Sequence, residues 1–215
     1  MKTHRKMYNA RYGGFLEAYF RNNLREYTIC SIIFLIGILL GIVFFNNLSS
    51  SQNLEISTYI SNSISNIKSI NNFSSFELLR EGIKNNIITT FSLWILGSTV
   101  IGMLLVYLIL GFKGFCFGYS ISAIIYTLGT GKGTLFALST IFLKNIIAIP
   151  CIIALAVSGM KLYKSIMQDK RKENIKLEVV RHTLFSLFVL ILLITSSIIE
   201  VYSSQTFLKI FIKYI

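Results

Sequence analysis

Long apolar stretches constrain this chain more than any other feature of its sequence. There are five of them, and they cover residues 27–45, 87–112, 114–128, 135–160 and 183–199. A helix needs roughly 20 apolar residues to cross a bilayer, and in hydrocarbon every backbone polar group must be hydrogen-bonded within the protein. We therefore predict an all-α fold, a polytopic membrane helical bundle with five transmembrane helices in a single integral membrane domain (residues 1–215).

Composition supports a membrane protein. The chain has 215 residues, of which 53% are hydrophobic and 14% charged, whereas charged residues make up about 25% of a soluble domain. The first stretch begins far from the N-terminus, and the sequence Asn46-Asn47-Leu48-Ser49 after it has no small-x-small cleavage pattern. It is therefore expected to be a retained helix and not a signal peptide.

Basic residues predict which side of the membrane each segment occupies. Two segments are strongly basic, residues 1–26 and the linker 161–182; their Lys and Arg residues are Lys2, Arg5, Lys6, Arg11, Arg21, Arg25, Lys161, Lys164, Lys170, Arg171, Lys172, Lys176 and Arg181. Cytoplasmic loops collect Lys and Arg, and both segments lie inside only if the chain crosses four times between them. The third stretch must then cross although it is short, with Lys113 snorkelling at its cytoplasmic end.

This topology places the N-terminus inside, the C-terminus outside, and the loop 46–86 outside. A basic cytoplasmic face attracts anionic lipids. We do not expect nucleic-acid binding, because the basic residues flank helices and no aromatic platform is interleaved with them.

The external loop contains a helical pattern. Isoleucines recur there at steps of three or four residues among Ser and Asn, at Ile56, Ile60, Ile64 and Ile67. This spacing predicts one face of an amphipathic helix. Ser74 and Glu77 fit a capping box, so a second helix is expected to begin there and continue into the next stretch. Two interpretations remain open and can coexist: the isoleucine face lies on the outer leaflet, or it docks an extracytoplasmic partner.

Catalytic and metal-binding patterns are not found in the sequence. His4 and His182 lie outside the apolar stretches with no carboxylate or thiol arranged around them, and no zinc-ligand spacing occurs. Cys30, Cys116 and Cys151 are isolated in or near apolar stretches and are expected to be reduced, buried residues. We therefore expect no enzymatic activity, no cofactor and no metal.

Glycines are spaced for close helix packing. Gly37 and Gly41 form one small-xxx-small pair, and Gly114 and Gly118 form another. Missing side chains let membrane helices approach closely, so these residues are expected to pack the bundle internally or to contact a second copy or a partner.

Lys144 and Asn145 are polar residues in the middle of the fourth stretch. A central Lys costs roughly 2.5–3.5 kcal/mol on insertion scales and should face a cavity or a partner. One interpretation is a polar path or ion-coupling site. The other is snorkelling plus hydrogen bonds inside the bundle, with Pro150 freeing the carbonyl of Ile146 as a local acceptor.

Several short motifs together resemble the stage II sporulation protein M family. They are the run Asn23-Leu24-Arg25-Glu26-Tyr27, the pair Asn85-Asn86, and Gly111-Phe112-Lys113-Gly114-Phe115 followed by Gly118. The resemblance covers nearly the whole chain, with the same size and five-span layout.

The resemblance implies a function without catalysis. Sporulation members of this family lie in the mother-cell membrane at the polar septum and act with stage II sporulation proteins D and P, which degrade septal peptidoglycan during engulfment. By resemblance this chain is a cell-membrane scaffold that positions those hydrolases, and no contact residue can be carried over. The alternative is a transporter or channel subunit that uses Lys144 and Asn145 in a polar path; an intramembrane enzyme ranks third, for want of a catalytic constellation.

Overall fold

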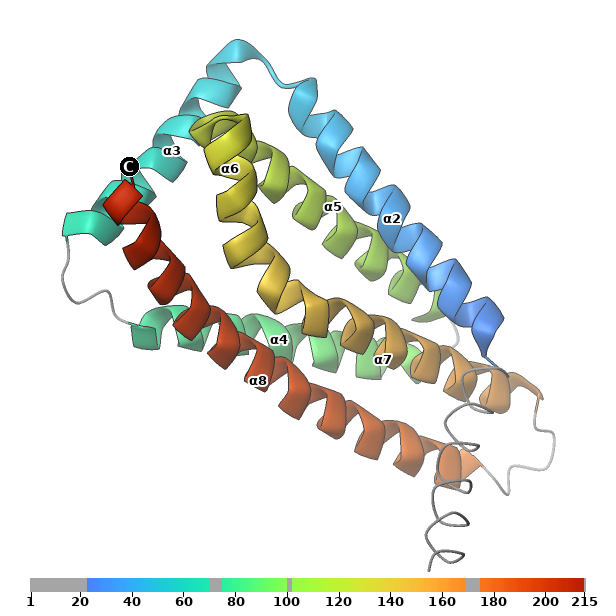
Figure 1. Cartoon of the computed structure of the whole chain (residues 1–215). Coiled ribbons are helices and arrows are strands. Elements are labelled where there is room, and N and C mark those ends of the chain that lie inside the picture. Colours follow the sequence, from blue (N-terminus) through green and yellow to red (C-terminus); the bar gives the residue numbers. More distant parts are fainter. Residues whose placement is uncertain (1–22, 70–74, 100–101, 169–174, 215) are drawn as a thin grey trace, which may run out of the picture.

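The computed structural model describes residues 23–69, 75–99, 102–168 and 175–214, and all regular elements in these ranges are helical (Figure 1). The elements are α2 (Leu24–Asn46), α3 (Ser50–Ser69), α4 (Ser75–Gly97), α5 (Gly102–Leu128), α6 (Thr130–Ala137), a π-helix η1 (Leu138–Phe142), α7 (Leu143–Gln168) and α8 (Ile175–Tyr214). The predicted all-α class is confirmed for the described part of the chain.

Four of these helices are long and apolar enough to cross a membrane. They contain the segments Leu24–Asn46, Gly102–Leu128, Asn145–Met167 and Ile175–Tyr202. Such lengths match the roughly 20 residues that a bilayer requires. The chain is therefore a multi-pass membrane protein.

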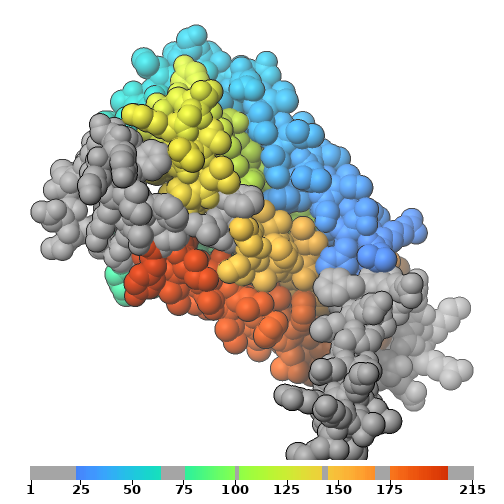
Figure 2. All heavy atoms as spheres, in the orientation of Figure 1, coloured from blue at the N-terminus to red at the C-terminus, as the bar shows by residue number. Residues whose placement is uncertain are grey.

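The helices run between two ends of the molecule (Figure 1). At one end lie the starts of α2, α5 and α8 and the ends of α4 and α7; at the other lie α3, α6, the end of α2 and the start of α4. Among the described residues, α2, α4, α5, the α6–η1–α7 unit and α8 run between these two ends. In Figure 2, α2 and α8 border this face of the molecule, with α6 and α7 between them.

Helices α2 and α5 are packed backbone against backbone. A Cβ atom added at Gly37 would overlap the carbonyl oxygen of Gly111, and one at Gly41 would overlap that of Phe115. From the other side, Gly114 faces the carbonyl of Phe34 and Gly118 faces that of Ile38. The absence of side chains at these glycines allows the close approach, as in small-residue packing of membrane helices generally.

The remaining core forms between α4, α5, α7 and α8. Large apolar side chains from these helices are fully buried together, including Leu93, Leu110, Leu155, Leu193 and Val189. A second close contact lies at the end of α4, where a Cβ at Gly97 would come within 2.7 Å of the Cα of Gly159 on α7. Helix α4 is therefore an integral part of the bundle.

Two predicted helix boundaries are wrong. We expected one helix over 87–112 and another beginning at 114, but α5 is continuous through Lys113, and the break lies after Gly97. The chain reverses there through a turn in which the amide of Gly102 donates to the carbonyl of Thr99 (3.1 Å). A side chain at Gly102 would overlap the carbonyl of Leu96. The turn carries no charge, so hydropathy runs through it, and the charge at Lys113 was misread as a boundary.

The predicted short third helix and the snorkelling Lys113 are corrected by the same finding. Helix α5 has 27 residues, about 40 Å at 1.5 Å per residue, and needs no special explanation for its length. Lys113 lies near the middle of this helix, roughly 16 Å from Gly102.

The loop and the linker are largely helical. The loop 46–86 consists mainly of α3 and the first half of α4, which confirms both helices predicted there; Ser74 of the capping box lies outside the described residues. The basic linker 161–182 is largely the end of α7 and the start of α8, and residues 169–174 lie outside the description. His182, which was expected outside the apolar stretches, is buried in the bundle.

Two neighbouring glycines of α5 allow a matched test of the backbone contact. Gly114→Ala should lower the free energy of unfolding in detergent by about 1–3 kcal/mol, because the new methyl group must push the α2 backbone away. Gly111→Ala should leave stability unchanged, since its Cβ would meet only Ile33 Cγ2, at 3.7 Å. Thermal unfolding of both variants measures the difference, and equal stability of the two would contradict the packing.

Candidate functional site

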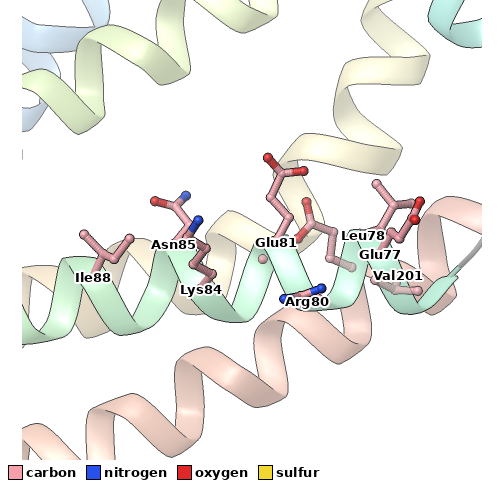
Figure 3. Close-up of a pocket in the computed structure, with 10 residues that line it drawn as sticks. Glu77, Leu78, Arg80, Glu81, Lys84, Asn85, Ile88 and Val201 are labelled. Carbon is pink, nitrogen blue, oxygen red and sulfur yellow. The ribbon is translucent and has the colours of Figure 1, made fainter.

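A concavity lined by charged side chains lies against α4 and α8. It has a volume of about 800 Å³, and its lining residues are Glu77, Leu78, Arg80, Glu81, Gly82, Lys84, Asn85, Ile88, Glu200 and Val201. Glu77, Glu81 and Asn85 follow one another at steps of four, so they share one face of α4. In Figure 3, Glu81 and Asn85 point to the same side of the helix.

Lys113 reaches this site from α5. Its ammonium nitrogen lies 3.3 Å from the Oδ1 atom of Asn85, to which it donates a hydrogen bond. A central Lys costs roughly 2.5–3.5 kcal/mol on membrane-insertion scales, and an acceptor on a neighbouring helix offsets part of that cost. Lys113 is therefore a charged residue near the middle of α5, where a helix boundary was expected.

The opposite face of α4 is fixed to α8 by hydrogen bonds. The side-chain amide of buried Asn86 donates to the carbonyl of Leu193 (2.9 Å) and lies 2.8 Å from the hydroxyl of Ser197. Near the C-terminal end of α4, Trp94 Nε1 donates to the hydroxyl of Thr183 on α8 (3.1 Å). These bonds hold α4 against α8 and leave the face with Glu77, Glu81 and Asn85 to line the concavity.

Ion pairs gather at the other end of the bundle. Lys164 near the end of α7 pairs with Glu26 in the first turn of α2. Glu178 on α8 pairs with Arg181 (2.9 Å) and lies 3.9 Å from Lys161 on α7. Nearby, Ser158 Oγ and His182 Nδ1 are 2.9 Å apart in a hydrogen bond between α7 and α8. His182 therefore serves the helix packing here, with no acid or thiol beside it in the described contacts.

The structure brings the four predicted packing glycines together. Gly37 and Gly41 of α2 meet the α5 segment that contains Gly114 and Gly118. Their contact is internal to the chain, which leaves little of these residues for a second copy.

The predicted docking isoleucines face inward where their side chains are described. Ile56 and Ile60 are half-buried and line a concavity of about 560 Å³ between α3, α5 and α6, together with Tyr119 and Phe136. The side chains of Ile64 and Ile67 lie outside the description. The first part of the isoleucine face thus covers the chain's own helices.

Of the predicted polar pair, Asn145 is not among the residues that line the charged concavity. The amide of Asn145 donates to the carbonyl of Ile141 one turn earlier (2.7 Å), so it is satisfied within its own helix. The side chain of Lys144 lies outside the description. Pro150 lies inside α7, as expected.

Within the described residues, no group of three or more His, Cys, Asp or Glu residues could hold a metal ion. Cys30 is buried, Cys151 half-buried and Cys116 exposed, and all three are free. These facts assign no chemistry to the chain.

The charged face of α4 was missed because the sequence analysis placed residues 46–86 outside the membrane as a loop. The signal was present, since Glu77, Glu81 and Asn85 recur at helical spacing. The contact of Asn85 with Lys113, 28 residues away, depends on how α4 folds back on α5, and spacing alone cannot supply it.

One comparison with known proteins identifies a family. The family model described as stage II sporulation protein M matches residues 30–205, well over half of the chain. No curated protein and no solved structure matches it.

Two asparagines of similar placement separate an interhelical bond from a local one. Asn86→Ala should cost about 1–3 kcal/mol of unfolding free energy, because it removes the bonds to α8 and leaves the buried Ser197 hydroxyl without this donor. Asn145→Ala should cost at most about 0.5 kcal/mol, since its amide bonds a carbonyl of its own helix. Unfolding in detergent measures both; a larger loss at Asn145 would refute this assignment.

Proposed function

The chain belongs to the stage II sporulation protein M family, and we propose that it is a non-enzymatic membrane scaffold that positions septal peptidoglycan hydrolases during engulfment. By family resemblance those hydrolases are stage II sporulation proteins D and P, and the membrane is the mother-cell membrane at the septum. The family match is the observation that carries this proposal.

The proposed topology has five crossings, with the N-terminus inside and the C-terminus outside. Its support is geometric, because α4 traverses the bundle although it is not among the four most apolar helices. The end that collects the starts of α2 and α8 and the end of α7 carries the basic residues Lys161, Lys164 and Arg181. Basic residues favour the cytoplasmic side, so α3 and α6 then lie on the side of the cell wall.

Helix α3 is the proposed contact with the hydrolases. It covers the outer end of the bundle, where its inward face meets α5 and α6. Leu54 is 69% exposed and Tyr59 75% exposed, and Tyr59 also lies at the rim of the concavity lined by Ile56 and Ile60. An apolar side chain from a partner could enter this rim without displacing α3.

Photocrosslinking from the rim of this concavity tests the scaffold. A photoreactive phenylalanine analogue at Tyr59 should crosslink to stage II sporulation protein D or P in sporulating cells, because that side chain is exposed on α3. The matched control is the same analogue at Leu104 on α5, which is 65% exposed on a helix long and apolar enough to cross the membrane. Capture of either hydrolase from Leu104 but not from Tyr59 would contradict docking on α3.

A second candidate function is a transporter or channel subunit. The observation that favours it is the charged concavity, where Lys113 donates to the lining residue Asn85. In this alternative the predicted pair Lys144 and Asn145 contributes to a polar path. If the chain is a scaffold, Lys144→Leu should leave engulfment unchanged, because a polar path has no part in positioning a partner. Removing residues 54–72 should delocalise the hydrolases. Microscopy of engulfing cells measures both, and the reverse pair of results would favour transport.

A further inference from the structure

The charged concavity against α4 and α8 has no part in the proposed scaffold function. We propose that it binds the zwitterionic headgroup of an outer-leaflet phospholipid, with the phosphate toward Lys84 and Lys113 and the ammonium toward Glu77 and Glu81. This inference rests on the proposed topology, which puts α3 and the start of α4 outside, but it does not depend on the scaffold function.

The charges of the concavity lie partly at the depth of the apolar segments. Gly82 on α4 lies beside Glu200 on α8, since a Cβ there would be 3.8 Å from Glu200 Oε2, and Glu200 directly follows the apolar stretch 183–199, at its outer limit. Lys84 and Asn85 therefore lie below that limit, and Lys113 lies near the middle of α5. Charged groups at this depth face water, a partner or a ligand, not lipid chains.

The concavity has the size of a ligand site. Ligand sites usually measure about 300–1,000 Å³, and this concavity measures about 800 Å³. That volume leaves room for a polar group of many atoms, such as a phosphate joined to an amine, together with the part of a larger molecule that carries it.

The two ends of the concavity differ in net charge. At the outer end the three carboxylates of Glu77, Glu81 and Glu200 outnumber the single guanidinium of Arg80. At the inner end Lys84 supplies one ammonium, and Lys113, bonded to Asn85 at 3.3 Å, supplies a second. A zwitterion whose anionic group enters first is complementary to this difference in net charge.

Exposed apolar residues of α4 below the concavity indicate that the zwitterion belongs to a lipid. Below Lys84, the same face of α4 continues as Ile88, Phe91 and Ile95, which are 54%, 58% and 39% exposed. These residues recur at steps of three and four, so they form one apolar stripe directly below Lys84. A soluble zwitterion would leave the stripe uncovered, whereas an acyl chain would cover it.

Lipid titration tests the ligand. The purified full chain in detergent is titrated with phosphatidylethanolamine, phosphatidylglycerol or soluble glycerophosphoethanolamine, and bound species are counted by native mass spectrometry. We expect phosphatidylethanolamine to bind at least tenfold more tightly than either of the other two. Lys84→Gln and Glu81→Gln should each weaken it at least fivefold, while Lys132→Gln on α6 should not. Equal binding of phosphatidylglycerol, or of the soluble headgroup, would overturn the proposal.

A second experiment tests the cavity without a ligand. With Cys30, Cys116 and Cys151 replaced by Ala, Lys84→Cys should react in intact cells with an impermeant thiol reagent. Ile95→Cys, three turns deeper on the same face, should not react. Failure of Lys84→Cys to react while Tyr59→Cys does react would exclude a water-accessible site. Neither result changes the crosslinking from Tyr59, so failure of this proposal is distinguishable from failure of the scaffold.

Discussion

The backbone contact between α2 and α5 is the constraint on which the rest of the bundle depends. Lipid chains are as apolar as leucine, so burying apolar surface does not by itself hold two membrane helices together. At Gly37, Gly41, Gly114 and Gly118, missing side chains let backbone atoms meet directly, and the sum of many short-range contacts replaces the hydrophobic effect. Helix α4 precedes α5 in the chain, and it folds back from the start of α5 to pack against α7 and α8.

Helix α4 can carry charged side chains because three faces of the helix have different surroundings. Asn86 and Trp94 bind α8, Leu93 enters the common core, and the face with Glu81 and Asn85 opens into the concavity. A helix with the same sequence alone in a bilayer would carry several charges into hydrocarbon at a cost of a few kcal/mol each. Its place in the bundle is therefore set by polar contacts, whereas α2, α5, α7 and α8 are also apolar enough to enter a membrane alone.

Hydropathy and spacing predicted the helical class, the packing glycines, the amphipathic helix α3 and the helix that leads into the second apolar stretch. They failed where geometry decides. The reversal at Gly97–Gly102 has no charge to mark it, and Lys113 was taken for a boundary because a charge usually ends an apolar stretch. His182 was expected outside the apolar stretches, beside basic residues, yet it is buried beside Ser158. The charged site combines residues of α4, α5 and α8, and no single stretch of sequence contains it.

The proposed position of the charged site and the outward position of α3 both depend on α4 being a fifth membrane crossing. The most direct test is a phosphatase fused after Ile215, since alkaline phosphatase is active only outside the cytoplasm. Five crossings from a cytoplasmic N-terminus predict an active fusion. A fusion that is inactive, while a fluorescent reporter at the same residue is bright in the cytosol, would mean four crossings. That result would contradict the proposal that α4 crosses the membrane.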